Sequence, residues 1–216
     1  MTKCSTIFFS LLTLSSARVL IIKRAATTAT DITDGVCKPV TLIFARGTTE
    51  PGNMGLTVGP PLAASMQKAF GADKVAIQGV DYAADIAGAG TGALAPQDAD
   101  GAKAMVALVM KVASACPSSK VVLSGYSQGA EQVRGALMDM PVGGAGIKMV
   151  SSVVTFGDPL RKDNFANIEQ AKTKVNCAAG DQVCNELFLI SAAHLSYGVN
   201  GDVDSSVAFV KSAMGM

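Results

Sequence analysis

Short apolar runs recur along the chain and alternate with stretches of helical periodicity. The runs have strand length and are bounded by Gly, Pro or polar residues, which predicts strands over residues 41–45, 74–80, 120–124, 149–156 and 174–176. Apolar positions with the spacing of one helix face predict helices over 62–70, 101–114 and 128–138. Apolar strands that alternate with helices indicate a mostly parallel sheet covered on both faces, a three-layer α/β/α fold.

Turn-forming residues mark the boundaries of these elements. Gly59-Pro60-Pro61 is expected to break the chain before the first helix, and Pro141 to open a Gly-rich turn. Residues 81–99 are rich in Gly and Ala and have little periodicity, so we expect a long surface loop there. Asp204 is expected to be the N-cap of a last helix. No repeat or linker follows residue 36, so residues 25–216 are predicted to form one domain.

The composition supports a globular protein and argues against a nucleic-acid partner. Of the 216 residues, 49% are hydrophobic and 16% charged, which is enough apolar material for one large core. The formal net charge is +1 and Trp is absent, so neither a basic patch nor a base-stacking surface is indicated.

The N-terminus has the pattern of a secretory signal peptide, predicted over residues 1–17. Lys3 supplies the positive start, residues 7–14 an apolar run, and residues 15–17 a small-residue cleavage site. The run is too short to span a bilayer, so we expect a secreted protein without stable membrane insertion.

A second apolar cluster, residues 19–22, ends at the dibasic pair Lys23-Arg24. This pattern is typical of a pro-peptide over residues 18–24, and the alternative is a longer, irregular signal peptide with an ordinary charged flank. Residues 25–30 are then expected to be an unstructured mature N-terminus.

The cysteines are typical of a disulfide-bonded extracellular protein. Cys4 lies in the predicted signal peptide and four others remain, which allow three pairings. Cys177 and Cys184 are close enough in sequence to close a small loop, which would leave Cys37 to pair with Cys116. Free buried cysteines are the less favoured alternative outside the cell.

Gly125-Tyr126-Ser127-Gln128-Gly129 stands between a predicted strand and a predicted helix. This Gly-x-Ser-x-Gly context is typical of a nucleophile elbow, in which a tight turn exposes the serine hydroxyl at the carboxyl edge of a sheet. The glycines leave room for the neighbouring strand and helix, and the helix N-terminus favours a developing negative charge. A small-residue turn without chemistry is the alternative.

A serine hydroxyl needs a base, and His194 is the one histidine of the chain. The acid that orients it should lie between the two in sequence. Of the carboxylates there, we favour Asp181, because the loop between Cys177 and Cys184 is short enough to be closed and would position a carboxylate at low entropic cost. The main rival is Asp158, which also follows a strand and which we interpret as a turn residue before Pro159.

An oxyanion hole needs at least two donors. The backbone N–H of Gln128, directly after the serine, is one candidate. The loop after the first strand should supply the other, and Thr48 could give both its N–H and its hydroxyl. Arg46 in the same loop is expected to be structural and to bind a carboxylate or carbonyl groups.

Four ordered blocks together resemble the fungal cutinase family, and in particular its yeast-type cutinase-like esterases. The blocks are Phe44-Ala45-Arg46-Gly47-Thr48-Thr49-Glu50-Pro51-Gly52, Gly125-Tyr126-Ser127-Gln128-Gly129, the segment from Cys177 to Cys184, and Ala193-His194-Leu195-Ser196-Tyr197-Gly198. The resemblance extends from Cys37 to the C-terminus. It implies a small, lidless α/β-hydrolase with five parallel strands, a Ser127-His194-Asp181 triad, and the disulfides Cys37–Cys116 and Cys177–Cys184.

The chain departs from the family pattern at two places. Family members usually carry Ser where Thr48 stands, and the extra methyl of Thr restricts χ1. Some cutinases also place an Asn in the loop after the second strand to support this donor. Residues 81–98 contain no Asn, so any support for Thr48 must come from elsewhere.

These observations predict a monomeric serine esterase that acts on insoluble polyesters and lipid esters without a metal or cofactor. The apolar run 187–190 before His194 is interpreted either as a rim that meets insoluble substrates or as a last buried segment. An acetylxylan esterase of the same fold is the alternative enzyme, disfavoured by this run and by the absence of Trp. A non-catalytic secreted surface-binding protein is the alternative from another class.

Overall fold

The structure is a computed structural model, and apart from Met1 it describes residues 26–216. The predicted signal peptide and pro-peptide, with Cys4 and the dibasic pair, lie outside the described residues and stay predictions.

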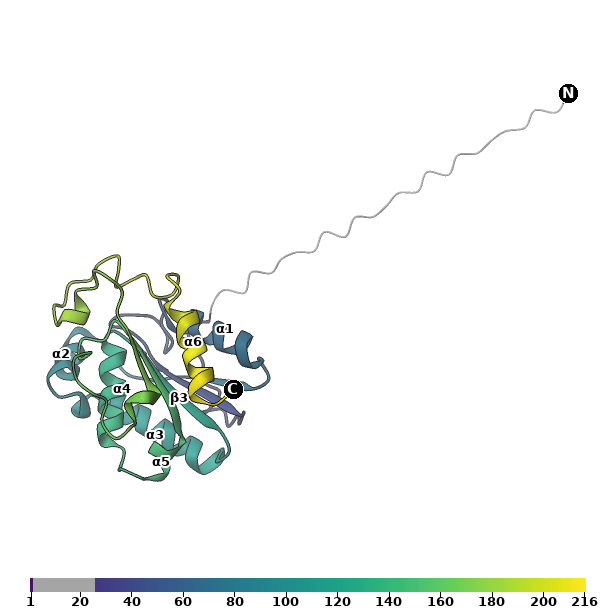
Figure 1. The fold of residues 1–216 in the computed structure, drawn as a ribbon, viewed down its shortest axis with the longest axis horizontal. Coiled ribbons are helices and arrows are strands. Elements are labelled where there is room, and N and C mark those ends of the chain that lie inside the picture. Colours follow the sequence, from purple (N-terminus) through teal and green to yellow (C-terminus); the bar gives the residue numbers. More distant parts are fainter. Residues whose placement is uncertain (2–25) are drawn as a thin grey trace.

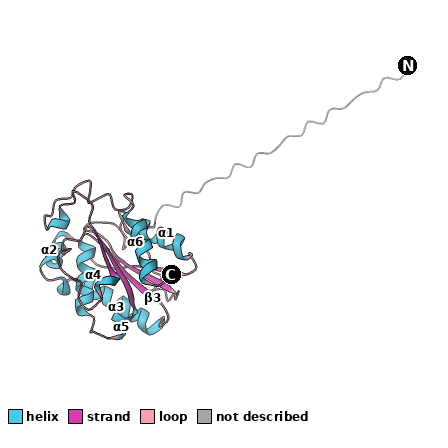
Figure 2. Cartoon of the chain, in the orientation of Figure 1, coloured by secondary structure: helices cyan, strands magenta, loops and turns pink. Residues whose placement is uncertain are grey.

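Five parallel strands form the centre of the molecule (Figure 2). They are β1 (Val40–Ala45), β2 (Val75–Gly79), β3 (Lys120–Tyr126), β4 (Val150–Phe156) and β5 (Thr173–Asn176), in the order β2-β1-β3-β4-β5. All four pairings are parallel, and every residue of β1 is buried, as expected for a strand covered on both faces. The five predicted strands are therefore confirmed, and all five end at the same edge of the sheet.

Helices cover both faces of this sheet and complete the three predicted layers (Figure 1). Helices α1 (Gly59–Phe70) and α6 (Asp202–Ala213) lie on one face, and α3 (Asp100–Ala115), α4 (Gln128–Asp139) and the short α5 (Ala145–Met149) on the other. Alternate residues of β1 serve the two cores. Leu42 and Phe44 pack in the cluster with α1 and α6, and Ile43 and Ala45 in the cluster with α3 and α4.

The boundaries of two predicted helices, the first and the last, were wrong. Pro60 and Pro61 do not precede α1 but form its first turn, where a missing N–H costs no helical hydrogen bond. The Gly-rich turn predicted after Pro141 is present, and it leads into α5. The last helix begins at Asp202 with Gly201 as N-cap, and Asp204 lies inside the first turn, where its carboxylate accepts a hydrogen bond from Ser65.

The long loop predicted over residues 81–99 is also wrong, because it contains the helix α2 (Ile86–Leu94) and a 3-10 turn, η1 (Pro96–Asp98). Asp85 is the N-cap of α2, and its Oδ1 accepts a 2.7 Å hydrogen bond from the N–H of Gly88. A Cβ atom on Gly88 or Gly92 would come within 3 Å of Gln128 or Glu131 of α4. These glycines therefore allow α2 to approach α4 closely, although they weaken the helical sequence pattern.

The segment 26–30 is not unstructured, in contrast to the expectation from sequence. The carbonyl of Thr27 accepts hydrogen bonds from the N–H groups of Asn53 and Met54, and Ala29 donates to the side chain of Asn53. Thr30 forms an antiparallel bridge with Gln78. The described start of the domain is therefore attached to the edge of the sheet.

Both predicted disulfides are present, Cys37–Cys116 and Cys177–Cys184, with Cα–Cα distances of 5.4 and 6.2 Å. The alternative of free cysteines is wrong for these four residues. Cys37 and Cys116 precede strands β1 and β3, so their bond lies at the amino edge of the sheet, away from the serine. Two disulfides fit an extracellular protein. No helix among the described residues is long and apolar enough to cross a membrane.

Candidate active site

Ser127 occupies the sharp turn between β3 and α4. Its φ of 55° and ψ of −123° are rare for a residue with a side chain, and its N–H donates a 2.9 Å hydrogen bond to the carbonyl of Phe156 on β4. The strained turn is held by the strands and helix around it, as expected for a nucleophile elbow. The side chain reaches the surface of a cavity at the carboxyl edge of the sheet.

The two glycines of the motif allow backbones to pack closely at this turn. A Cβ on Gly125 would lie 2.1 Å from the carbonyl oxygen of Gly129, and a Cβ on Gly129 would lie 2.0 Å from that of Ala45 in β1. Both contacts are with backbone atoms, which cannot move aside as a flexible side chain can. The role that the sequence assigned to these glycines is therefore confirmed.

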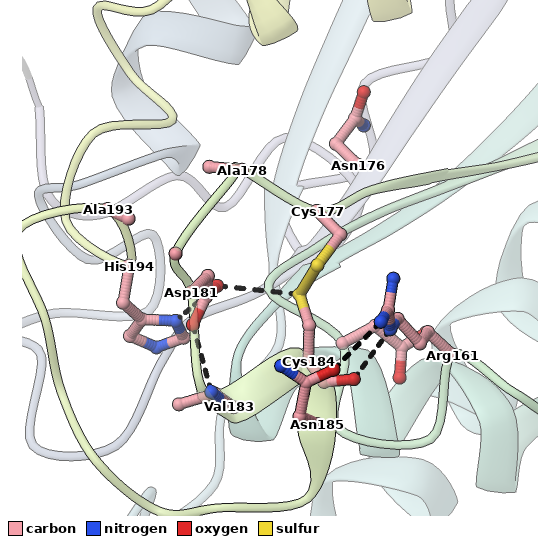
Figure 3. The surroundings of a disulfide bond; sticks show 12 residues. Arg161, Asn176, Cys177, Ala178, Asp181, Val183, Cys184, Asn185, Ala193 and His194 are labelled. Carbon is pink, nitrogen blue, oxygen red and sulfur yellow. Dashed lines mark hydrogen bonds and ion pairs between the residues drawn. A yellow bond between two sulfur atoms is a disulfide. The ribbon is translucent and has the colours of Figure 1, made fainter.

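His194 and Asp181 form a buried pair after β5 (Figure 3). Nδ1 of His194 lies 2.9 Å from Oδ2 of Asp181, and the two residues are only 1% and 2% exposed. Because Nδ1 faces a carboxylate, it carries the ring proton in the neutral imidazole and leaves Nε2 as the free base. Tyr126 packs against the imidazole, with ring centroids 4.9 Å apart, and its hydroxyl donates a 2.9 Å hydrogen bond to the His194 carbonyl.

The loop that carries Asp181 is closed by the Cys177–Cys184 disulfide (Figure 3). Oδ1 of Asp181 accepts a 3.0 Å hydrogen bond from the N–H of Val183, and Arg161 donates a 2.6 Å bond to the carbonyl of Cys184. The Cys184 sulfur also lies 3.5 Å from Asp181 Oδ2, but a disulfide sulfur carries no hydrogen and cannot donate. The carboxylate is thus held by backbone and loop contacts, as its position in the sequence suggested.

Asp158 has a different partner. Its carboxylate is fully buried and accepts hydrogen bonds from Nε of Arg134, at 3.1 and 2.9 Å, and from Thr155, with Nη2 of Arg134 also 2.9 Å away. It is therefore an internal ion-pair residue, and its interpretation as a simple turn residue understated its role. Since the Arg134 guanidinium occupies it, Asp158 is not available to orient His194.

Sequence reasoning missed Gly157, which separates β4 from Asp158. Its φ is +56°, and a Cβ there would lie 2.7 Å from Cε1 of His194 and 3.1 Å from Oδ2 of Asp181. A side chain at this position would push the imidazole away from the carboxylate. The Gly-Asp-Pro turn that follows the fourth predicted strand was the available signal, but it was interpreted only for its aspartate.

The loop after β1 lies beside Ser127 and is organised by Glu50. Its carboxylate accepts hydrogen bonds from the N–H groups of Gly47, Leu56 and Thr57, at 2.8, 3.0 and 2.8 Å. Arg46 donates to the carbonyls of Glu50 and Tyr82, both at 2.7 Å, which confirms its expected structural role. The sequence did not reveal the role of Glu50, because its partners are backbone groups.

Thr48 and Gln128 meet across this loop. Oγ1 of Thr48 donates a 3.0 Å hydrogen bond to Oε1 of Gln128, so the side chain after the serine supports the threonine that no Asn supports here. Gln128 opens α4, and its backbone N–H has no acceptor within the helix. The two expected oxyanion-hole residues are therefore next to each other and beside Ser127.

A cavity of about 600 Å³ brings three of the predicted site residues together. Thr48, Ser127 and His194 all line it, although no direct hydrogen bond joins the Ser127 and His194 side chains in the described part of the chain. Such bonds often tighten only when substrate is bound. Burial raises the pKa of the neighbouring Tyr126 far above its usual range, and this tyrosine stays neutral.

The rim of the cavity is apolar. Leu56, Ile86, Phe188, Ile190 and Leu195 line it, and each is more than half exposed. The run 187–190 forms neither a strand nor a helix, and its four side chains are 52 to 64% exposed, so its interpretation as a buried segment was wrong. Within residues 26–216, no group of three or more His, Cys, Asp or Glu side chains could hold a metal ion.

Comparisons with known proteins identify the family of this chain. A sequence model of the cutinase family matches residues 36–214. A cutinase of Botryotinia fuckeliana is 40% identical over 203 residues, which cover 94% of this chain and 96% of that protein. Cutinase 4 of Emericella nidulans is 44% identical over 194 residues, which cover 89% and 80%.

Solved structures show the same relationship. Trichoderma reesei cutinase, solved in complex with a C11Y4 phosphonate inhibitor, has a TM-score of 0.78 at 35% identity and matches 88% of this chain and 80% of that one. An acetylxylan esterase shares the fold, with a TM-score of 0.64 at 24% identity. From the family match over most of its length and from its relatives, the chain is a member of the cutinase family, which are carboxylic ester hydrolases.

Proposed function

We propose that this protein is a secreted, monomeric serine esterase that hydrolyses cutin-like and aliphatic polyesters and lipid esters. Ser127 is the nucleophile, His194 the general base and acid, and Asp181 the residue that orients the imidazole. The observation that supports this assignment best is the Asp181–His194 pair, because His194 lines the same cavity as the serine at the elbow.

The proposed reaction is acyl transfer through an acyl-enzyme. Nε2 of His194 takes the Ser127 proton while Oγ bonds to the ester carbonyl carbon, and the resulting oxyanion lies between Thr48 and the N–H of Gln128. The C–O bond to the alcohol then breaks, and the imidazolium returns the proton to the leaving alcohol. Water, deprotonated by His194, attacks the acyl carbon. The bond from that carbon to Ser127 Oγ breaks, the acid leaves, and the imidazolium returns its proton to Oγ, while Asp181 stabilises the imidazolium in both steps.

The apolar rim supports an apolar, insoluble substrate. Exposed side chains on three separate segments surround the opening of the cavity, at Leu56, at Ile86, and at Phe188, Ile190 and Leu195. A contiguous patch of this kind on a soluble protein is typical of a binding surface. It could lie against a polyester or lipid particle while an ester group enters the cavity.

Covalent labelling tests the catalytic assignment. A phosphonate or organophosphate ester should label the protein with one equivalent at Ser127 and abolish hydrolysis of a soluble ester. Ser127→Ala should lose both labelling and activity, while Ser124→Ala, a buried serine three residues earlier on β3, should keep both. Labelling that persists in Ser127→Ala would refute the assignment, and the absence of labelling in the wild type would favour a non-catalytic surface-binding protein.

A second experiment tests the substrate class. The release of acetate from acetylated xylan is compared with the clearing of an emulsified aliphatic polyester by the same preparation. We expect the polyester to be preferred, and Ile86→Ser or Phe188→Ser to weaken clearing more than the hydrolysis of a short soluble ester. A preference for xylan would instead identify an acetylxylan esterase.

A further inference from the structure

Tyr197 lies directly behind the Asp181–His194 pair. It is fully buried, and its ring packs edge-on against Tyr126, Phe156 and His194, with centroid distances of 6.1, 5.9 and 6.3 Å. These three rings pack around the Tyr197 ring, and a buried aromatic side chain has few alternative rotamers. The orientation of the Tyr197 ring is therefore fixed. The hydroxyl is therefore aimed at one point, and that point is the carboxylate of Asp181.

The hydroxyl of Tyr197 uses both of its hydrogen-bonding functions. It donates to Oδ2 of Asp181 at 2.5 Å, and it accepts a 3.0 Å hydrogen bond from the N–H of Ala178. Oδ2 is also the oxygen that faces Nδ1 of His194. Oδ1, in contrast, is used by the N–H of Val183. The tyrosine and the imidazole thus share one carboxylate oxygen, and the tyrosine links that oxygen to the backbone of the disulfide-closed loop.

The Tyr197 hydroxyl remains protonated, and so remains a hydrogen-bond donor, over the whole pH range in which an esterase works. Burial and then the hydrogen bond to Asp181 raise the pKa of Tyr197 far above its usual value, so it keeps its proton. The titratable groups that face His194 are Asp181, Tyr126 and Tyr197, with Glu50 across the cavity. Of these, Tyr197 can alter the negative charge on the Asp181 carboxylate that faces the imidazole, because it bonds to that carboxylate and not to an imidazole nitrogen.

We infer that Tyr197 is a positioning residue of the triad. It fixes the Asp181 carboxylate and reduces the extent to which that carboxylate stabilises the protonated form of His194. The inference rests on the proposed function, in which this pair does the proton transfer. The positive end of the O–H dipole points at the carboxylate and offsets part of its charge. Without the hydroxyl, the carboxylate would stabilise the imidazolium more strongly and would be held in place less firmly.

The test is Tyr197→Phe, which keeps the packed ring and removes the hydroxyl. His194 is the only histidine of the chain, so its ring signals in an NMR titration are unambiguous. We expect the midpoint of that titration to move to higher pH by about half a unit to one unit. The acid limb of the kcat/KM profile should move with it, and kcat on the plateau should fall roughly tenfold with little change in KM.

Tyr126→Phe is the matched control, because it removes a hydroxyl that bonds to the His194 carbonyl and not to the carboxylate. We expect its ring titration to keep the wild-type midpoint, whatever happens to its rate. An unmoved midpoint in Tyr197→Phe, or an equal shift in both variants, would overturn the inference, since either result would reduce Tyr197 to a packing residue.

A further substitution covers the case in which Tyr197→Phe fails to fold because the Ala178 N–H loses its acceptor. 3-Fluorotyrosine placed at position 197 keeps the hydroxyl and makes it a stronger donor, so the midpoint should move to lower pH. No shift there would also overturn the inference. These titrations need no substrate, and failure of the proposed function would be recognised separately by wild-type protein that neither reacts with a phosphonate nor hydrolyses esters.

Discussion

The protonation of the Glu131 carboxyl depends on where the residue lies in the fold. It lies one turn after Ser127, it is fully buried, and neither carboxylate oxygen has a hydrogen-bond partner among the described residues. Burial, and then the negative charge of Asp158, raise the pKa of Glu131 from 4.5 to about 9. The folded protein therefore holds this proton at neutral pH, where the unfolded chain has lost it.

This difference makes stability depend on pH. The contribution is fully present below the unfolded pKa of 4.5 and is lost as the pH rises towards 9, because the folded state binds more protons in that window. We expect Glu131→Gln to become more stable relative to wild type as the pH rises from 5 to 8.5, by about 1.4 kcal/mol per pH unit at most. Urea unfolding of both proteins at several pH values measures this difference in the free energy of unfolding.

Glu169→Gln is the control for this prediction. It changes a carboxylate whose side chain is 74% exposed and whose ion pair with Lys172 spans 3.4 Å, a kind of pair that contributes little. Its difference from wild type should stay flat over the same range. A difference for Glu131→Gln that is equally flat would mean that the buried carboxyl ionises normally.

Thr48 poses a question of hydrogen-bond direction. A hydroxyl has one hydrogen, so the Thr48 hydroxyl cannot donate to Gln128 Oε1 and to an oxyanion at the same time. If the carboxamide turns its NH₂ towards Thr48 during the reaction, the hydroxyl is free to donate to the oxyanion. The side chain of Gln128 would then support the donor, and its backbone would supply another.

Thr48→Val keeps the shape of the side chain and removes the hydroxyl. If the hydroxyl stabilises the oxyanion, kcat for a soluble ester should fall on the order of a hundredfold with little change in KM. Thr48→Ser keeps the hydroxyl and should stay within a few fold of wild type. Full activity in Thr48→Val would show that backbone N–H groups alone form the oxyanion hole.

At the scale of elements, α2 is the helix that sequence periodicity did not reveal. Its sequence, Ile-Ala-Gly-Ala-Gly-Thr-Gly-Ala-Leu, contains three glycines, each unfavourable in a helix interior. Gly92 nevertheless has a packing reason, because a Cβ there would lie 2.2 Å from Oε2 of Glu131. Gly90 has none, since no atom of a neighbouring element lies within 4 Å of the place that a Cβ would take. The helix supplies Ile86 and Ala89 to the cavity wall.

The two glycines allow a matched prediction. Gly90→Ala should stabilise the protein by about 0.5–1 kcal/mol, because alanine is the better helix former and has open space there. Gly92→Ala should destabilise it by about 1–3 kcal/mol, because the new Cβ would also lie 3.0 Å from the Cβ of Glu131, which cannot move without a shift of α4. The free energy of unfolding in urea measures both, and two changes of the same sign would contradict this account of the α2–α4 contact.

At the scale of the whole molecule, the two disulfides have different tasks. Cys37–Cys116 joins positions 79 residues apart at the amino edge of the sheet, and Cys177–Cys184 joins positions 7 residues apart beside Asp181. Cross-linking distant positions restricts the unfolded chain more than cross-linking near ones. The long-range bond should therefore serve global stability, and the short-range bond the geometry of the active site.

Paired Cys→Ser variants separate these tasks. Removing Cys37–Cys116 should lower the free energy of unfolding by about 4 kcal/mol and leave kcat nearly unchanged at a temperature where the variant is folded. Removing Cys177–Cys184 should lower the free energy of unfolding by only about 2 kcal/mol. It should also reduce kcat, because Asp181 is held less firmly. Urea unfolding and ester hydrolysis measure the two effects. Equal losses of stability and activity in both variants would contradict the separation.

Features that depend on local chain properties could be predicted from the amino-acid sequence alone. Apolar runs of strand length located all five strands, and the Gly-x-Ser-x-Gly motif located the elbow, because its glycines are required by close backbone contacts at that same turn. The count of one histidine left a single candidate for the base, and the close spacing of Cys177 and Cys184 indicated the loop that holds Asp181.

Contacts between side chains that are distant in sequence could be identified only from the folded structure. The partner of Thr48 is 80 residues away on α4, the partner of Asp158 is Arg134, and the hydroxyl that faces Asp181 belongs to Tyr197. Helix α2 was not predicted because Gly88 and Gly92 allow contact with α4 at the expense of helical propensity. Periodicity and motifs reflect interactions between residues that are close in sequence. The contacts of Thr48, Asp158 and Tyr197 depend instead on how separate elements pack against each other.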